Sequence, residues 1–405
     1  ITTRFWNCKA KNAGMPRRSC FDLGALMGTV HRPAKLHLIA GARPNFMKIA
    51  PLWHALKDTS DIAPVFVHTG QHTNSVMSSE VWRDLGLPAP DHHLMPLDAG
   101  QTAERPSFPN DAMRAAYKVL CQADRPDAVL VVGDVSSALT CATVAHELAI
   151  PLIHLEAGLR SFDARMIEET NRIEIDHLAE LLLTPSPDAD QNLIREGIAT
   201  DRIVRVGNIM MDSLERQRPA IEAARMCGTL GVEHDGYGLV TLHRPENVDD
   251  PKRLMAIMGE LEKLAERQPI VFPVHPRTQN ALRLIGWRPS HPQTALQLRE
   301  PMPYAGFISL ILTARFVVTD SGGLQEETSY LGVDCFTLRD TTERPVTVTH
   351  GTNKLVTLDN MVSIVRQRDP HDLRRCETPI DLWDGKAATR VVVALRDFIA
   401  SMPRS

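Results

Sequence analysis

The chain has 405 residues, 43% of them hydrophobic and 23% charged, which is typical of a globular protein long enough for two domains with sizeable cores. Its 45 basic and 49 acidic residues give a net charge of -4. This balance excludes a general electrostatic attraction to nucleic acid or to an anionic membrane, so a site for an anionic ligand must be built locally.

The cysteines indicate a reducing compartment. There are seven, an odd number with no CxxC pair, so their spacing suits neither a zinc site nor a disulfide framework. We therefore expect reduced cysteines in a cytoplasmic protein without a metal site. Residues 1–34 are basic and irregular and lack the apolar core of a signal peptide, so we expect a disordered extension or an over-long start that lies outside the fold. The apolar stretch "FISLILTARFVV" is too short to span a membrane.

Ordered structure is expected to begin near Lys35. Residues 36–40 are apolar and predict a short buried strand, and residues 47–56 carry apolar side chains at helical spacing. The alternation continues with strands predicted in "PVFVHTGQ", "DAVLVVGD" and "PLIHLEAG" and a helix over 137–148. The run "LAELLLTPS" then leads into a helix in "DADQNLIREG" that ends at Gly197.

The second half shows the same alternation. Strands are predicted in "GLVTLHRPEN" and "PIVFPVHP" with a helix over 251–266 between them, and "RFVVTDSGGLQEETSYLG" predicts a strand, a turn and a helix. Short apolar runs that alternate with helices are typical of parallel sheets covered on both faces. Strand signals pause over 207–235, so we predict an α/β fold of two Rossmann-like, doubly wound domains.

Polar motifs follow nearly every predicted strand, namely GARPN, TGQH, GDVSS, EAGLR, HRPEN, HPR and DSGG. Ligands of doubly wound sheets bind outside the carboxyl ends of the strands. We therefore expect these motifs to line a cleft between two facing domains.

The "TDSGG" turn is the first candidate for a phosphate site. Ser321, Gly322 and Gly323 lead from a predicted strand into a helix, where backbone N–H groups can point at an anion. Glu327 follows near the first helical turn, where a carboxylate can accept both hydroxyls of a ribose. The alternative is an ordinary strand-to-helix turn with acidic residues placed favourably for the helix dipole.

Further candidates are basic and lie after other strands. Arg43 and Lys48 in "GARPNFMK" are able to neutralise a diphosphate, although for this motif alone a solvated turn is the better explanation. His243, in "TLHRPEN", is able to donate to a phosphate, although a lone histidine is more often structural. The "TLRDTTERP" segment with Arg344 follows one βα unit after the glycines and is expected to complete the pocket.

The segment "LIHLEAGLRSFDARMIEETNR" is unusually rich in charge for a loop that leaves a buried strand. Its carboxylates alternate with arginines and comprise Glu156, Asp163, Glu168 and Glu169 among Arg160, Arg165 and Arg172. Two readings remain: acid–base groups for catalysis, or a network of surface ion pairs.

Taken together, these motifs resemble the non-hydrolysing UDP-N-acetylglucosamine 2-epimerase family. The resemblance runs from about Lys35 to the last helix, and DSGGxQEE, EAGLR and DTTERP together are its most specific part. It implies the glycosyltransferase-B architecture, with domains over 35–207 and 208–384 and a C-terminal helix over 385–405 that returns to the first domain. It also implies a homodimer that interconverts UDP-GlcNAc and UDP-ManNAc without a redox cofactor or a metal.

By the same resemblance, roles are assigned to matching positions. Asp134, Glu156 and Glu168 match acid–base residues, and Arg43 and Lys48 match the basic pair of the first turn. Substrate and UDP contacts are implied at Arg43, Arg160, His243, Arg244, Asn247, His275, Ser321, Gly322, Gly323, Glu327 and Arg344, with His243 also among the catalytic residues.

The reaction implied explains why carboxylates are needed. The proton on C2 of the sugar is weakly acidic, and its removal becomes feasible when UDP departs from C1. Re-addition of UDP to the 2-acetamidoglucal, with protonation on the opposite face, inverts C2. Cations or dipoles at the diphosphate and acid–base groups near the sugar are therefore required. The sequence does not decide which carboxylate is the base.

Two positions depart from the family pattern. Asn45 replaces the glutamate usual in GTRPE, and Ile167 replaces the proline usual before the EE pair. These changes affect a charge near the cleft and the backbone that aims Glu168, and neither removes a catalytic side chain.

A second ligand site known in some bacterial members is only partly present. Its TGQH residues match Gln71 and His72, but Asn74 stands where a glutamine is usual, and Gly100 and Gln101 lie where an arginine is expected. Glycine does not replace an arginine that clamps a diphosphate. The resemblance thus implies conversion of UDP-ManNAc without activating UDP-GlcNAc.

Other functions fit parts of this pattern. The sequence leaves open a hydrolysing 2-epimerase that releases N-acetylmannosamine and a 2-epimerase of a modified UDP-sugar such as a 2,3-diacetamido uronic acid. It also leaves open a glycosyltransferase of the same architecture and a sensor that binds a nucleotide sugar without catalysis.

Overall fold

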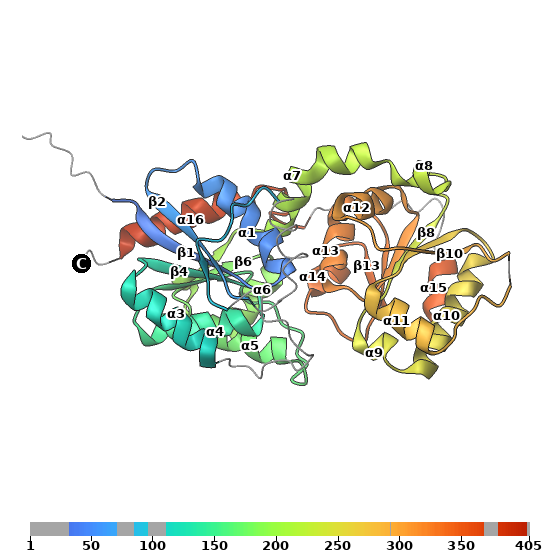
Figure 1. The fold of residues 1–405 in the computed structure, drawn as a ribbon, viewed down its shortest axis with the longest axis horizontal. Coiled ribbons are helices and arrows are strands. Elements are labelled where there is room, and N and C mark those ends of the chain that lie inside the picture. Colours follow the sequence, from blue (N-terminus) through green and yellow to red (C-terminus); the bar gives the residue numbers. More distant parts are fainter. Residues whose placement is uncertain (1–31, 71–84, 96–110, 292, 368–379, 403–405) are drawn as a thin grey trace, which may run out of the picture. The chain divides into compact units, whose positions relative to one another are not determined.

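The computed structural model describes residues 32–70, 85–95, 111–291, 293–367 and 380–402, and for Arg43 it describes the backbone only. These residues form two parallel sheets, and helices cover both faces of each sheet (Figure 1). The prediction of two doubly wound α/β domains is therefore confirmed. Among the described residues, no helix has the length and apolar character needed to cross a bilayer.

The first sheet has the strand order β3-β2-β1-β4-β5-β6-β7. All neighbouring strands run parallel. The strands are β1 (Ala34–Ala40), β2 (Ile62–His68), β3 (His92–His93), β4 (Ala128–Val132), β5 (Leu152–Leu155), β6 (Leu181–Thr184) and β7 (Ile203–Arg205). The order reverses between β1 and β4, so this sheet has the topological switch point at which ligands of doubly wound folds bind.

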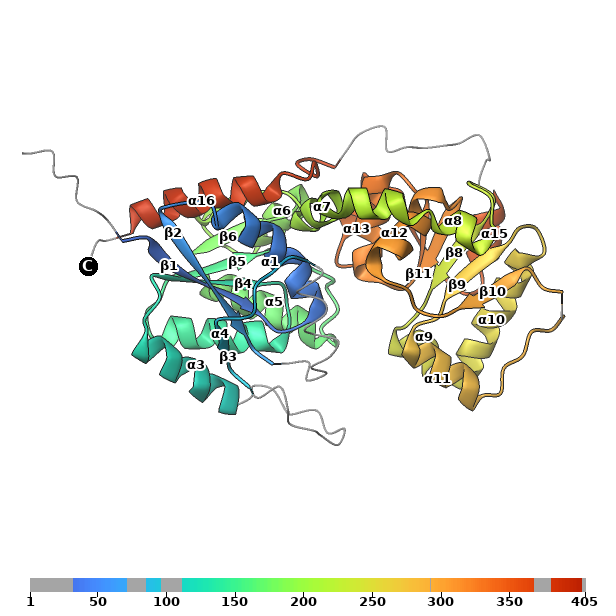
Figure 2. The same cartoon turned by 45° about the horizontal axis from the view of Figure 1, so that its top comes forward.

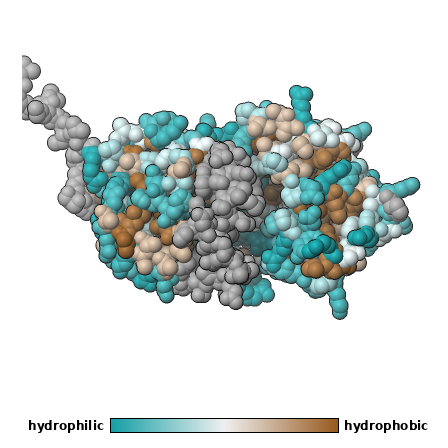
Figure 3. Space-filling view, viewed as in Figure 1, coloured by the Kyte–Doolittle hydropathy of each residue, from teal (hydrophilic) through white to brown (hydrophobic). Residues whose placement is uncertain are grey.

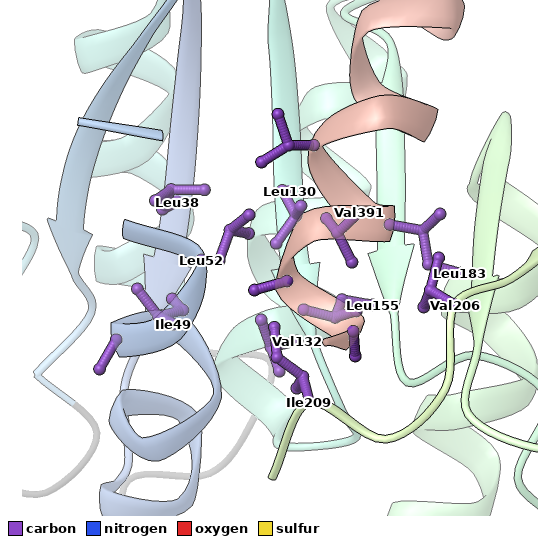
Figure 4. Close-up of a cluster of buried hydrophobic side chains, with 14 of the residues drawn as sticks. Leu38, Ile49, Leu52, Leu130, Val132, Leu155, Leu183, Val206, Ile209 and Val391 are labelled. Atoms are coloured by element: carbon purple, nitrogen blue, oxygen red, sulfur yellow. The ribbon is translucent and has the colours of Figure 1, made fainter. Parts of the chain in front are cut away.

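Two apolar layers hold this sheet. One face packs against α1 (Arg43–Leu56) and α16 (Ala387–Ser401), and the other packs against α3 (Asp111–Ala123), α4 (Ser136–Glu147), α5 (Ile167–Leu178) and α6 (Pro187–Arg195). In Figure 4, side chains from strands and from both helices of the first face point toward one another, including Leu38, Leu130, Ile49 and Val391. These side chains are buried in one cluster, so the ends of the strands that carry them are held in fixed positions.

The second sheet has the order β10-β9-β8-β11-β12-β13. Its strands are β8 (Gly238–Thr241), β9 (Ile270–Pro273), β10 (Leu296–Arg299), β11 (Phe316–Thr319), β12 (Cys335–Leu338) and β13 (Asn353–Val356). One face packs against α10 (Pro251–Ala265), α11 (Pro276–Leu284) and α15 (Met361–Gln367), and the other packs against α7 (Ile209–Ala224), α12 (Tyr304–Thr313) and α13 (Gly322–Leu331). Short helices α8 (Met226–Leu230), α9 (Pro245–Val248) and α14 (Pro345–Thr349) and a 3-10 turn (Thr200–Arg202) complete the described elements.

The region where strand signals pause is helical. It contains α7 and α8, and α7 packs against α1 and α16 as well as against α12 and α13 (Figure 2). The domain limits 35–207, 208–384 and 385–405 remain a prediction. The face shown in Figure 3 carries hydrophilic residues and separate hydrophobic patches, which agrees with a chain that has 43% hydrophobic and 23% charged residues.

Helix α1 begins earlier than its apolar spacing predicts, at Arg43 rather than at Met47. The reason is Pro44, which lies in the first helical turn, where a missing N–H breaks no hydrogen bond. The "GARPN" motif is therefore the start of a helix, and it lies at the carboxyl end of β1.

The start of α16 and the segment before it are held by polar contacts to α7 and to the residue that follows β6. Asp212 accepts hydrogen bonds from the backbone N–H groups of Ala387 and Ala388, at 3.0 and 2.8 Å, and so satisfies the start of α16. The Trp383 indole donates to the carbonyl of Pro185 at 2.9 Å. Gly207 has a φ of +86°, and a Cβ there would collide with the carbonyl oxygen of Leu382.

Gly207→Ala should therefore destabilise the protein by about 3 kcal/mol, the sum of left-handed backbone strain and overpacking. Gly197→Ala is the matched control, because Gly197 has a φ of +82° and no atom within 4 Å of the added Cβ. It should cost only the backbone strain, about 1 kcal/mol. Urea unfolding measures the free energy of unfolding that each variant loses. Equal losses would show that the Leu382 carbonyl does not restrict the side chain at position 207.

Candidate active site

Glu156 directly follows strand β5 and lies between two cations. Lys48 of α1 forms an ion pair with its carboxylate, and Nη2 of Arg344 lies 3.2 Å from its Oε1. The Glu156 side chain is 9% exposed. Its φ of +73° lies in the left-handed region, which costs a non-glycine residue about 1 kcal/mol or more. A strained backbone that delivers a carboxylate between two cations indicates a functional turn.

The Arg344 guanidinium contacts three carboxylates. Besides Glu156, it contacts Glu326 through Nε at 2.8 Å and Glu343 through Nη1 at 2.6 Å. Burial alone lowers the pKa of an arginine, but these carboxylates outweigh burial and raise the pKa of Arg344. Burial raises the pKa of Glu326 despite the opposing charge of Arg344. For Glu343, Arg344 and Arg339 overcome burial and lower the pKa to about 2.

Asp134 follows β4 and is held by an arginine from α5. Arg172 donates to Asp134 Oδ2 through Nε at 3.1 Å and through Nη2 at 2.5 Å, and its Nη1 donates to Glu169 at 2.5 Å. Burial raises the pKa of Asp134, but Arg172, with help from Lys48 and Arg344, more than reverses this and lowers it. Asp134 is therefore ionised at neutral pH and close to the charges around Glu156.

The two adjacent glutamates of "IEETNR" have different environments. Glu169 is 4% exposed and accepts hydrogen bonds from the backbone N–H groups of Ser161 and Phe162, from the Ser161 hydroxyl and from Arg172. Glu168, one residue earlier in the first turn of α5, is exposed. Glu169 thus builds the loop after β5, whereas Glu168 is accessible for chemistry.

Arg160 does not join this group. It is 1% exposed, and its guanidinium pairs with Asp176 at 2.7 Å and with Glu196 at 2.6 Å, while Nη1 donates to the Leu159 carbonyl. Asp176 also receives a hydrogen bond from His154, at 2.6 Å. All three nitrogens of Arg160 are engaged within the fold, so the geometry favours a structural role over the substrate contact expected from the motif.

Asp320 ties together two loops of the second sheet. It is fully buried and accepts hydrogen bonds from the backbone N–H groups of His243 and Arg244 and from the Asn247 amide. Burial raises the pKa of Asp320. The His243 side chain above all, and also the Arg244 N–H and the Asn247 amide, more than reverse this and lower it. Asn247 is 2% exposed and also donates to the Leu338 carbonyl, so it too acts within the fold.

His243 and His275 remain near each other and partly accessible. Their ring centroids are 5.3 Å apart, and the His243 side chain is 38% exposed. Burial and the neighbouring His243 lower the pKa of His275, whose Nδ1 accepts a hydrogen bond from the Arg277 N–H at the start of α11. His243 is held by Asp320, with Nδ1 3.1 Å from Oδ1, whereas His275 is the more exposed residue of the two.

The glycine turn lies beside the Arg344 cluster. Ser321 precedes α13, and Gly322 and Gly323 are its first residues. A Cβ at Gly322 would lie 2.5 Å from Glu343 Oε1, whereas a Cβ at Gly323 would meet nothing within 4 Å. Gly322 is thus required for packing, and Gly323 faces open space in which an anion can approach the helix start.

The departures from the family pattern have simple structural outcomes. Asn45 is 3% exposed, accepts a hydrogen bond from the Ala42 N–H at 3.0 Å and donates to the Val132 carbonyl at 3.0 Å. It therefore joins the start of α1 to the end of β4 rather than leaving a charge missing in the site. Ile167 is the first residue of α5 and is 58% exposed. The side chain of Arg43 and the loop with Gln71 and His72 lie outside the described residues.

The arrangement combines two chemical capabilities. Carboxylates at the ends of adjacent strands β4 and β5 offer acid–base groups, and cations and a helix start offer an anion site. Sequence reasoning assigned no separate supporting role to the groups that hold them in place: Arg172, Glu169, Asp320, Glu326 and Glu343. All five lie inside or beside the motifs, so their position in the sequence was a signal. Their burial shows that they support the site from within the fold, and burial cannot be read from a motif.

Comparisons with known proteins show which family the chain resembles. A family model described as UDP-N-acetylglucosamine 2-epimerase matches residues 54–396. A UDP-N-acetylglucosamine 2-epimerase of Methanocaldococcus jannaschii is 36% identical over 364 residues, covering 88% of this chain and 98% of that protein. A UDP-2,3-diacetamido-2,3-dideoxy-D-glucuronate 2-epimerase of Pseudomonas aeruginosa is 37% identical over 326 residues, covering 80% of this chain and 88% of that protein.

A solved structure also matches along nearly the whole chain. The crystal structure of the M. jannaschii UDP-GlcNAc 2-epimerase in complex with UDP-GlcNAc and UDP has a TM-score of 0.76 and 34% identity, and the match covers 90% of this chain and 99% of that one. The expected glycosyltransferase-B architecture is thereby confirmed.

The two glutamates of α5 should respond differently to the same substitution. Glu169→Gln places an amide group where four donors converge, so it should lower the free energy of unfolding by about 2–4 kcal/mol. Glu168→Gln, on the exposed side, should change it by less than about 0.5 kcal/mol. Denaturant unfolding measures both, and a stable Glu169→Gln protein would contradict the assignment of Glu169 to the loop scaffold.

Proposed function

As the chain belongs to the UDP-N-acetylglucosamine 2-epimerase family and is an epimerase, we propose that it reversibly inverts C2 of UDP-GlcNAc to give UDP-ManNAc. The observation that carries the proposal is the position of Glu156 and Asp134. Both carboxylates lie at neighbouring strand ends, and each is paired with cations that also suit a diphosphate. Acid–base groups and anion-binding groups thus lie together, as elimination of UDP requires.

In the proposed reaction a carboxylate takes the proton from C2, and the C1–O bond to UDP breaks with its electron pair going to UDP. The resulting 2-acetamidoglucal and UDP stay bound. UDP then re-adds to C1 while an acid delivers a proton to the opposite face of C2. Lys48 and Arg344 are proposed to stabilise the leaving diphosphate, with Arg43, Arg244, His243 and His275 near its phosphates and Ser321 and Gly323 at the helix start. Glu327 is proposed to bind the ribose.

The non-hydrolysing outcome, a cytoplasmic location, a homodimeric state and a role in supplying activated sugar for surface polysaccharide are parts of the same proposal. They rest on the resemblance of the motifs to the family. The enzyme is expected to act without added nicotinamide or metal.

A second candidate differs in the sugar. The P. aeruginosa relative that acts on a 2,3-diacetamido uronic acid is about as similar to this chain as the M. jannaschii UDP-GlcNAc 2-epimerase. The carboxylates and the diphosphate groups would serve both substrates equally. A carboxylate at C6 of the sugar would need a further cation near the sugar, so comparing the two substrates separates the candidates.

The decisive experiment is NMR of the purified enzyme with UDP-GlcNAc in deuterated water. We expect UDP-ManNAc that carries deuterium at C2, because the proton lost in elimination exchanges with solvent. Product that retains the C2 proton, or a strict need for nicotinamide, would refute elimination. Free N-acetylmannosamine as the main product would identify a hydrolysing enzyme, and turnover only with the diacetamido uronate would favour the second candidate.

The acid–base residues are tested by isosteric amides. Asp134→Asn, Glu156→Gln and Glu168→Gln should each cut turnover about 100-fold or more, because each removes a proton-transfer group or its charge. Glu174→Gln, elsewhere on the exposed side of α5, is the control and should retain native turnover. Near-native turnover in any of the first three variants would exclude that residue from the mechanism.

A further inference from the structure

Two adjacent glutamates in the middle of α13 have different partners. Glu326 faces the Arg344 guanidinium, with 2.8 Å between Nε and Oε1. Glu327, the next residue, accepts a hydrogen bond from the Tyr304 hydroxyl at 2.7 Å. Consecutive helical residues point about 100° apart, so the two carboxylates face different neighbours. Glu326 belongs to the ion cluster around Glu156, and Glu327 belongs to the contact between α13 and α12.

Tyr304 is a rigid donor. It is the first residue of α12 and follows Pro303, whose ring restricts the backbone just before the helix. Its ring is half-buried and packs against both the core of the first sheet and the core between α7, α12 and the second sheet. A tyrosine ring has two side-chain torsions, and packing on both sides leaves its hydroxyl little freedom to move.

The hydrogen bond from Tyr304 restricts the carboxylate. Glu327 is 4% exposed, so its oxygen atoms have little water to replace a lost donor. A hydroxyl donating to a carboxylate is charge-assisted and stronger than a bond between neutral groups. A carboxylate offers about four acceptor positions, so the bond from Tyr304 to Oε1 restricts its orientation and is compatible with acceptance from further hydroxyls.

We propose that Tyr304 is a positioning residue that aims the Glu327 carboxylate at the two hydroxyls of the ribose, and that it thereby makes the enzyme prefer ribonucleotide sugars to 2′-deoxyribonucleotide sugars. This inference rests on the proposed function, in which Glu327 binds the ribose. A carboxylate with a fixed plane accepts from two neighbouring hydroxyls at once. A 2′-deoxyribose has one hydroxyl of this pair, so it gains less from the alignment.

The chain provides a matched control. Tyr330 lies on the same helix as Glu327, and its hydroxyl donates to Glu215 of α7 at 2.8 Å. The Tyr304 and Tyr330 contacts thus have the same chemistry, and only the first involves the proposed ribose ligand. Tyr330→Phe should therefore reproduce any general effect of removing a half-buried hydroxyl.

The test is calorimetric titration of the full chain with UDP and with 2′-deoxy-UDP. Tyr304→Phe should weaken UDP binding about tenfold, the effect of one hydrogen bond to a charged group. Its affinity for 2′-deoxy-UDP should change less, so the preference for the ribonucleotide shrinks. Turnover at saturating UDP-GlcNAc should fall little while KM rises, and Tyr330→Phe should alter none of these values.

A double-mutant cycle with Glu327→Ala separates the possible failures. If Tyr304 acts through Glu327, Tyr304→Phe should have no further effect in the Glu327→Ala background. Native UDP affinity and native preference in Tyr304→Phe, with weakened binding in Glu327→Ala, would overturn the inference and leave the proposed function intact. Native UDP affinity in Glu327→Ala would instead refute the ribose contact itself. Equal losses for both nucleotides in Tyr304→Phe would reduce Tyr304 to a structural residue and would also overturn the inference.

Discussion

The buried guanidinium of Arg344 is the interaction on which the site depends. It lies against carboxylates from three places: Glu156 at the end of β5, Glu326 in α13 and Glu343 beside it in the chain. An arginine can satisfy several acceptors at once because its donors form a planar fork. Removing it would take away the cation that Glu326 contacts and one of the cations around Glu156 and Glu343, which is far more costly than losing a surface ion pair. The geometry of the acid–base groups is therefore coupled to the geometry of the nucleotide side.

Buried charged side chains also hold the loops at the other strand ends. Asp320 holds the loops after β8 and β11, and Arg172 holds both Asp134 after β4 and Glu169 in the loop after β5. Behind them, His154 and Arg160 converge on Asp176 under the Glu156 turn. Loops of this kind are usually the mobile part of a doubly wound fold. Here buried charged side chains fix these loops to the strands. This gives the preorganisation that electrostatic catalysis requires.

The sequence predicts the architecture well because it depends on patterns that repeat. Alternating apolar runs and helices gave two parallel sheets, and polar motifs marked the strand ends. It predicts the roles of single residues less well, because a shift of one helical residue turns a side chain by about 100°. Glu168 and Glu169 share a motif, yet one is exposed and the other is part of the scaffold. Arg160 has the residue type of a phosphate ligand, and only its burial shows that its donors are engaged. Tyr304 lies outside every motif and reaches Glu327 through the fold alone.

The charge balance of the site also bears on how the proposed reaction proceeds. Without substrate, Lys48 and Arg344 neutralise Glu156. The diphosphate of the substrate brings further negative charge and competes for the same cations, so its arrival weakens their hold on the carboxylates. A carboxylate that loses its cation partners binds a proton more readily. Departure of UDP from C1 increases the charge on the diphosphate and draws the cations further toward it, at the step when a carboxylate must accept the C2 proton. Glu326 shares Arg344 with Glu156, so the same guanidinium contacts both carboxylates. Leaving-group stabilisation and proton transfer are thus linked through one guanidinium.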